Sequence, residues 1–207
     1  MKASSHILCT LALFYLFVQL LGTSLVAVMP AAIFLTPFVI LGAAAPDADH
    51  PQSWISRNFR GLARGLRLLV RCSAGKKNAE HRGMSHSLVF FGLLFIILYF
   101  LCIIIIKCRL CWLCSLAFLF GYLAHLLEDT LTVQGIPALL PFSRKRYSLK
   151  LFSTGSRAEQ VFVVVVFILL LLELYYKWQL PSLTLQKLLL QLKNLAGKEC
   201  FWRLQMG

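Results

Sequence analysis

Acidic residues are scarce in this chain of 207 residues. Eight Asp and Glu stand against 21 Lys and Arg, which gives a formal net charge of +13. The sequence also has no glycine-rich phosphate loop, no Ser/His/Asp nucleophile arrangement and no internal repeat. These absences argue against a P-loop nucleotide-binding protein, a triad hydrolase and a solenoid repeat protein.

Apolar residues dominate what is present. They make up 59% of the chain, and the mean hydropathy is +0.76. Because a bilayer is crossed by about 20 apolar residues, the uncharged runs predict an all-α integral membrane protein with about five transmembrane helices. The runs cover residues 7–28, 29–45, 88–106, 110–127 and 161–176. We expect one membrane domain at residues 1–176, followed by an amphipathic C-terminal tail at 177–207.

The N-terminal run has a second interpretation, as a cleaved signal peptide ending near Ser24 to Ala27. Cleavage there would remove His6 from the mature protein. The run is longer than an ordinary signal-peptide core and leads almost directly into the next apolar run, which favours a transmembrane helix.

Basic residues predict the topology. They concentrate in the loops after the second and fourth predicted helices, whereas the turn between the third and fourth contains only Lys107 and Arg109. The positive-inside rule therefore places both large loops and the N-terminus in the cytoplasm. Five crossings would put the basic tail outside, which conflicts with the rule unless the fifth helix does not cross.

Every aspartate and four of the five histidines fall in three short clusters, at residues 46–50, 81–86 and 125–129. Such side chains are costly near lipid, so their concentration indicates a functional site. An up-and-down bundle would bring these predicted helix ends to one leaflet, together with those of the first and fifth helices. The nine candidate metal ligands are His6, Asp47, Asp49, His50, His81, His86, His125, Asp129 and Glu159.

This donor set is larger than the four positions around one zinc ion, which implies two or more ions, or one ion whose ligands are oriented by the other residues. We favour two divalent ions, zinc being expected before manganese or iron. His125 and Asp129 are four residues apart, which places both on one face of a helix. Taken singly, each cluster has an ordinary alternative: a structural hydrogen bond for this pair, a solvated loop for His81 and His86, and a polar cap for residues 47–50.

The basic segment after the second predicted helix has helical periodicity. Its arginines at 57, 60, 64, 67 and 71 share one face, while Ile55, Phe59, Leu62, Leu66 and Val70 occupy another. The pattern predicts an amphipathic helix lying on anionic lipid. Alternatively, Arg57, Arg64 and Arg82 bind a substrate phosphate. Nucleic acid is not an expected partner, because the basic residues flank membrane spans and lack interleaved aromatics.

Cysteines are not expected to form a metal cluster. Cys108, Cys111 and Cys114 form a C-x-x-C-x-x-C string, but the string enters a membrane span and has no fourth ligand nearby.

Three motifs carry a family resemblance: Asp47 to Pro51 (DADHP), His81 to Ser87 (HRGMSHS), and Gly121 to Asp129 continuing to Gly135-Ile136-Pro137. In order and spacing, residues 1–170 resemble the bacterial inner-membrane, membrane-bound metal-dependent hydrolases, also described as LexA-regulated. Ser85 stands where relatives usually have Thr, which retains the hydroxyl. The resemblance implies that eight of the nine candidate ligands form the site and that Glu159, the ninth, joins them. A more distant likeness, in the mixed His and Asp ligands, is to zinc-dependent phospholipases C.

Together these features predict a membrane-bound, metal-dependent hydrolase with its site at the cytoplasmic face of the bacterial inner membrane. A metal-activated water would attack a phosphoester or ester, and Glu159 or Asp49 would act as general base. At headgroup depth the expected partners are membrane lipids and an amphiphilic substrate. The alternatives are a non-catalytic metal-ion carrier or sensor and a metal-stapled scaffold.

Overall fold

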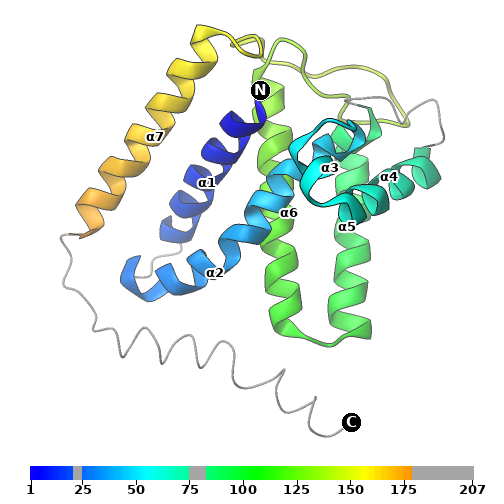
Figure 1. Ribbon diagram of the computed structural model, residues 1–207, viewed down its shortest axis with the longest axis horizontal. Coiled ribbons are helices and arrows are strands. Elements are labelled where there is room, and N and C mark those ends of the chain that lie inside the picture. The colour runs from blue at the N-terminus through cyan, green and yellow to red at the C-terminus, as the bar shows by residue number, and fades with distance from the viewer. Residues whose placement is uncertain (21–24, 75–82, 179–207) are drawn as a thin grey trace, which may run out of the picture.

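The computed structural model describes residues 1–20, 25–74 and 83–178, and within these ranges it contains helices and two isolated β-bridges (Figure 1). The long helices are α1 (Ala3–Leu20), α2 (Leu25–Ala44), α5 (Leu88–Tyr99), α6 (Arg109–Leu131) and α7 (Arg157–Trp178). The shorter elements are η1 (Ala45–Asp49), α3 (Trp54–Asn58), α4 (Arg60–Ala74), η3 (Met84–His86) and η4 (Phe100–Ile105), a π-helical continuation of α5.

Five apolar helices confirm the predicted all-α membrane fold. Among the described residues, four stretches have the length and composition to cross a membrane: Met29–Asp49, Leu88–Ile105, Arg109–Leu131 and Arg157–Tyr175. The apolar part of α1, Ala3–Val18, is shorter. Ser24, at the alternative cleavage site, lies outside the described residues, as does the tail from residue 179 onward.

The helices run up and down, so their polar ends gather at one end of the molecule. The N-terminus, the end of α6 and the starts of α5 and α7 lie at the upper end in Figure 1, and the α5–α6 turn lies at the opposite end. We refer to the upper end as the polar end. The basic segments also lie there, since α4 and the loop between α6 and α7 both cover it.

Two glycines allow α2 and α6 to cross in backbone contact. A Cβ on Gly42 would collide with the carbonyl of Phe118, and a Cβ on Gly121 would collide with the carbonyl of Val39. Small residues at helix crossings permit this close approach in membrane proteins. The crossing lies directly before His125 on α6 and Asp47 after α2, so it positions both side chains.

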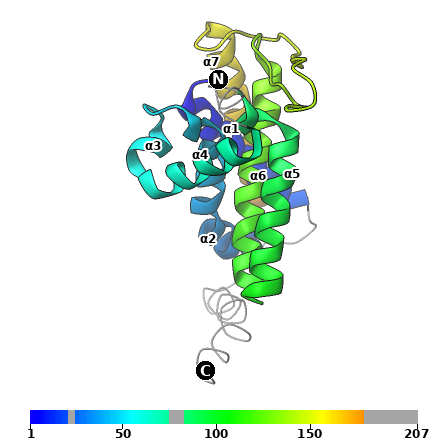
Figure 2. The same cartoon turned by 90° about the vertical axis from the view of Figure 1, so that its right-hand side faces the viewer.

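The basic segment differs from its prediction in two respects. A break at Phe59, with φ −126° and ψ 61°, divides it into α3 and α4, so Arg57 does not continue the stripe of α4. Moreover, Ile55, Leu66 and Val70 are buried in the protein core rather than in lipid. The prediction of one continuous helix is therefore wrong. Part of its apolar face packs on η1 and η3, while Phe59 and Leu62 are exposed. Figure 2 shows α3 and α4 lying across the long helices at the polar end.

The loop after α6 returns across the polar end and closes it. Thr132 forms a bridge with Phe152, and Ile136 forms one with Tyr147. Gly135 makes the turn with a φ of +57°, a conformation in which a Cβ is strained and would collide with the Tyr147 carbonyl. The loop also anchors α5, because Leu88 N–H donates to the Ala138 carbonyl.

Candidate metal centre

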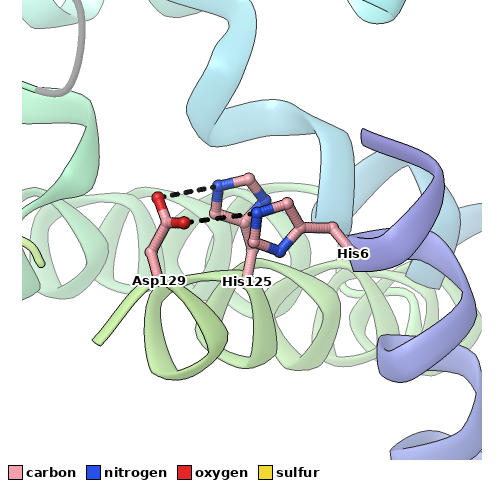
Figure 3. Close-up of side chains that lie close together, drawn as sticks. All are labelled: His6, His125 and Asp129. Carbon is pink, nitrogen blue, oxygen red and sulfur yellow. Dashed lines mark ion pairs between the residues drawn. The ribbon is translucent and has the colours of Figure 1, made fainter. Parts of the chain in front are cut away.

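His125 and Asp129 lie one helical turn apart near the end of α6 and project to the same side (Figure 3). His125 Nε2 is 3.8 Å from Asp129 Oδ2, and the two side chains are 1% and 0% exposed. Burial of both groups in a membrane protein is costly unless each has a partner. The predicted pairing of these two residues on one helix face is confirmed.

His6 reaches the same place from α1. Its ring stacks on that of His125, with centroids 3.8 Å apart and planes 17° from parallel. His6 Nε2 lies 3.3 Å from Asp129 Oδ1 (Figure 3). The α-amino group of Met1 lies 3.0 Å from the same oxygen. His6, His125 and Asp129 thus form one group with the geometry of metal ligands.

Two short 3₁₀ helices supply the other members. Pro46 lies in the first turn of η1, directly before Asp47, while Gly83 directly precedes η3, which contains His86. His86 Nε2 is 3.6 Å from Asp47 Oδ1 and 3.6 Å from Asp129 Oδ2. Asp47, His86 and His125 form a second potential ligand group, which shares His125 with the first.

The hydrogen bonds of the three imidazoles assign their tautomers. His125 Nδ1 donates to the Ala43 carbonyl at 2.6 Å, and His6 Nδ1 donates to Glu128 Oε2 at 2.6 Å. Ser85 gives its only hydroxyl proton to Asp49 Oδ2, so its oxygen accepts from His86 Nδ1 at 3.1 Å. With each Nδ1–H engaged, Nε2 of all three rings faces the carboxylates, and in a neutral ring this nitrogen carries a lone pair that can bind a metal.

A cation between the imidazole rings and the carboxylates would stabilise this arrangement. A lone pair facing a carboxylate oxygen is repulsive, and three imidazolium rings this close would repel one another. A metal ion between Nε2 atoms and carboxylates removes both problems, and the second hydrogen bond of each ring is the one that orients metal-bound histidines. His125 Nε2 itself makes no hydrogen bond within the described residues.

Four ligand atoms approach one another between these segments, and we refer to them as the four-atom cage. They are Nε2 of His86 and His125, Oδ1 of Asp47 and Oδ2 of Asp129, and the four nitrogen-to-oxygen distances among them are 3.6, 3.6, 3.9 and 3.8 Å. Bonds of about 2.0–2.2 Å to a tetrahedral zinc ion place neighbouring ligand atoms about 3.3–3.6 Å apart. The nitrogen-to-oxygen distances exceed this range by at most a few tenths of an ångström, so these residues are compatible in chemistry and in spacing with the predicted metal.

Several residues that support this centre were not predicted from the sequence. Glu128 is 3% exposed and bonds to both His6 and Thr10, whose hydroxyl donates to Oε1 at 3.0 Å. Tyr122 is fully buried and donates to the Ser85 carbonyl. The signal for Glu128 was its place beside Asp129. Nothing in the sequence indicated Tyr122, because an aromatic residue inside an apolar helix is ordinarily interpreted as part of the hydrophobic core.

Three predicted ligands lie outside both groups. Asp49 acts on His86 through Ser85. His50 accepts from the backbone N–H of Gln52 at 3.3 Å. Glu159 accepts from the N–H groups of Lys2 and Gly155 at 2.9 and 2.7 Å, so it ties α7 to the start of α1. The η1 turn and the first turn of α7 direct these side chains away from the cage.

The other residues predicted for the metal or phosphate site lie either outside the described residues or on the surface of α3 and α4. His81 and Arg82 lie outside the described residues. Arg57 and Arg64 are exposed on α3 and α4. No cysteine belongs to either ligand group in the described part of the chain.

Asp47 gives the buried cluster its opening. Its side chain is 26% exposed, whereas those of His6, His86, His125 and Asp129 are at most 2% exposed. It lines a small cavity of about 60 Å³ between α1, the end of α2 and α3, together with Ala3, Ile7, Ala43, Ala44, Ser53, Trp54 and Ile55. A polar-edged cavity of this size has room for water.

Comparison with known proteins agrees with the family resemblance. The model of the YdjM inner membrane protein family matches residues 1–190. Inner membrane protein YdjM of Escherichia coli K12 and that of Shigella flexneri are each 26% identical over 140 residues. The match covers 65% of this chain and 63% of each relative, so the chain spans less than two thirds of their length. No solved structure matches. A multi-pass inner-membrane location follows from the apolar helices and these relatives, and the chain belongs to the YdjM inner membrane protein family.

Proposed function

We propose that this protein is a membrane-bound, metal-dependent hydrolase that cleaves a phosphoester or other ester of an amphiphile. The observation that carries the proposal is the convergence of three imidazole Nε2 atoms and two carboxylates at the polar end of a membrane bundle. Such a concentration of donors is expensive near lipid and suits a hydrolytic centre.

The four-atom cage would hold the first ion. His86 and His125 supply nitrogen, and Asp47 and Asp129 supply oxygen. The second ion expected from the sequence would use His6 and the other oxygen of Asp129, which lie 3.3 Å apart. The α-amino group of Met1 lies 3.0 Å from the same oxygen, so a second ion there would take the place of this ammonium group.

A bound divalent ion would lower the pKa of a coordinated water toward ~7 and stabilise the developing anion. Besides His86, His125, Asp47 and Asp129, the ion would need a position for water, which manganese or iron would provide more readily than zinc. Asp47 borders the water-sized cavity, so water would reach the ion from the Asp47 side of the cage. Through its second carboxylate oxygen, Asp47 is also better placed to accept a proton from water than Asp49, which bonds to Ser85, or Glu159, which bonds to backbone N–H groups.

The cytoplasmic side is supported by the charges around the site. Arginines of α3 and α4 and the basic residues between α6 and α7 lie at the polar end, whereas Lys107 and Arg109 lie at the opposite end. The positive-inside rule then directs the centre to the cytoplasm at headgroup depth. The stripe of Arg60, Arg64 and Arg71 on α4 is exposed there and suits anionic lipid.

A metal-stapled scaffold is the second candidate, favoured by one observation. The five ligand residues come from α1, η1, η3 and α6, so an ion would cross-link segments that are distant in sequence. A carrier is less favoured, because both ligand groups lie at one end and not near the middle of the bundle.

Turnover under controlled metal loading tests the proposal. Protein purified in detergent, stripped by chelation and reloaded with zinc, manganese or iron is incubated with labelled membrane phospholipids and isoprenoid phosphates. We expect hydrolysis that depends on metal and is lost in His125→Ala. Metal-dependent thermal stability with no turnover of any substrate would support the staple and eliminate the hydrolase.

A further inference from the structure

An apolar groove runs along the bundle on the membrane side of the candidate metal centre. Its volume is about 550 Å³, and α1, α2, α5 and α6 line it almost entirely with carbon. Representative lining residues are Phe14, Leu35, Phe91, Phe120 and Leu123. Ligand pockets in proteins are commonly about 300–1,000 Å³, so the groove has the capacity for a small ligand.

The floor of the groove is recessed below the lipid-facing surface. Ala32 and Ala117 are 2% and 4% exposed, and Phe14 is also buried. In contrast, the flanking Phe17 and Leu113 are exposed. Two alanines at the base leave a channel between larger side chains, which differs from the convex lipid-facing surface of α7, where Val164 is 54% exposed.

The length and direction of the groove relate it to one leaflet. Its residues on α6 extend from Leu113 to Leu123, two positions before His125. Ten residues of α-helix span about 15 Å. This is about half of a hydrocarbon core of roughly 30 Å. A chain lying in the groove would therefore extend from the level of the centre into the middle of the membrane.

A single face of α1 connects the groove to the opening at Asp47. Ala3 and Ile7 line the small cavity beside Asp47, and Phe14 and Val18 line the groove. The intervals of four, seven and four residues place all of them on the same helix face. The water-sized cavity and the apolar groove thus follow one another along α1.

We infer that the groove holds a single hydrocarbon chain of the substrate while its ester headgroup occupies the cavity at Asp47. The identity of the occupant rests on the proposed function. The substrate class is then a long-chain phosphoester or ester, bound with its chain in the bundle and its head at the polar end. Ala32 and Ala117 determine the space for the chain.

Variants that fill the groove test this assignment. Ala32→Phe and Ala117→Phe place a ring in the floor from two different helices, and Val164→Phe adds the same ring to the lipid-facing side of α7 as a control. Hydrolysis is measured with a long-chain phosphoester and with a water-soluble aryl phosphoester, after confirming equal metal content. We expect KM for the long-chain substrate to rise about tenfold or more, since each displaced methylene is worth about 10 to 200-fold. The soluble substrate and the control variant should show no change. An unchanged long-chain KM in both filled variants would overturn the groove assignment and leave the hydrolase intact.

Photolabelling separates this inference from the proposed function. A long-chain alkyl phosphate with a terminal diazirine is irradiated with the detergent-purified protein, whether or not turnover is observed. We expect the label on α6 and α1 peptides of the wild type and at least tenfold less in the filled variants. Equal labelling of wild-type and filled proteins would mean that bulk lipid alone covers the groove, and would refute the assignment.

Discussion

The crossing of α2 and α6 makes Gly121 a sensitive test of how the fold builds the centre. A Cβ at this position would meet the Val39 carbonyl and would lie 2.8 Å from the backbone nitrogen of Ala43. Backbone atoms cannot rotate away as a side chain does, so Gly121→Ala would force α2 and α6 apart. The Ala43 carbonyl, which now accepts from His125 Nδ1 at 2.6 Å, would move with α2.

Two effects set the magnitude. Overpacking of a close contact costs about 1–3 kcal/mol. A buried group that loses its hydrogen-bond partner costs about 1–3 kcal/mol more. We therefore expect Gly121→Ala to lower the free energy of unfolding by about 2–6 kcal/mol. Metal affinity should fall by about 10 to 100-fold, because His125 loses the partner that orients its ring.

Gly92→Ala is the matched control. Gly92 lies on α5, and a Cβ there would meet nothing within 4 Å. The same chemical change should therefore stabilise the helix by about 0.5–1 kcal/mol and leave metal binding unchanged. Thermal unfolding in detergent and titration of metal into the stripped protein measure both quantities. If Gly121→Ala behaved like Gly92→Ala in both assays, the account of the helix crossing would be refuted.

Other residues give further tests. Glu128→Gln keeps the shape but removes the charge that holds His6 Nδ1, so chelator competition should show about 10 to 100-fold weaker binding at the His6 position; unchanged affinity would exclude the role of Glu128. Ser85→Ala should weaken metal binding by a similar factor because His86 and Asp49 lose their link, whereas Ser85→Thr should retain it; equal loss in both would implicate packing instead. Asp47→Asn should lower metal content with a Tm shift of less than about 4 °C without metal, because this side chain is partly exposed; retention of full metal content would remove Asp47 from the cage.

Much of this architecture could be predicted from the sequence because lipid imposes strong constraints. Apolar runs gave the helices, and the cost of polar groups near lipid made residues such as His125 and Asp129 conspicuous. Up-and-down topology then placed their helix ends together. His6, Asp47 and His86 converge with them in the structure. This convergence could be predicted because it required only the positions of the helix ends along the sequence.

The parts that the sequence did not predict depend on local turns and on packing between distant segments. Asp49 and His50 share a short turn with Asp47, and only the 3₁₀ geometry of η1 determines which of them faces the cage. Glu159 was assigned to the site from its position at a helix start, but backbone N–H groups take both of its oxygens. Similarly, periodicity identified the apolar face of α4 but not the fact that η1 and η3 cover it.

Metal content tests the central claim most directly. Elemental analysis of the detergent-purified wild-type protein should find at least about one divalent ion per chain, and about two if His6 and Asp129 also hold one. His125→Ala and Asp129→Ala should lose most of this metal while remaining inserted in the membrane, and Arg64→Ala on the exposed face of α4 should retain it. A wild-type protein that binds no divalent ion after reloading, or full metal content in both His125→Ala and Asp129→Ala, would contradict the proposed centre.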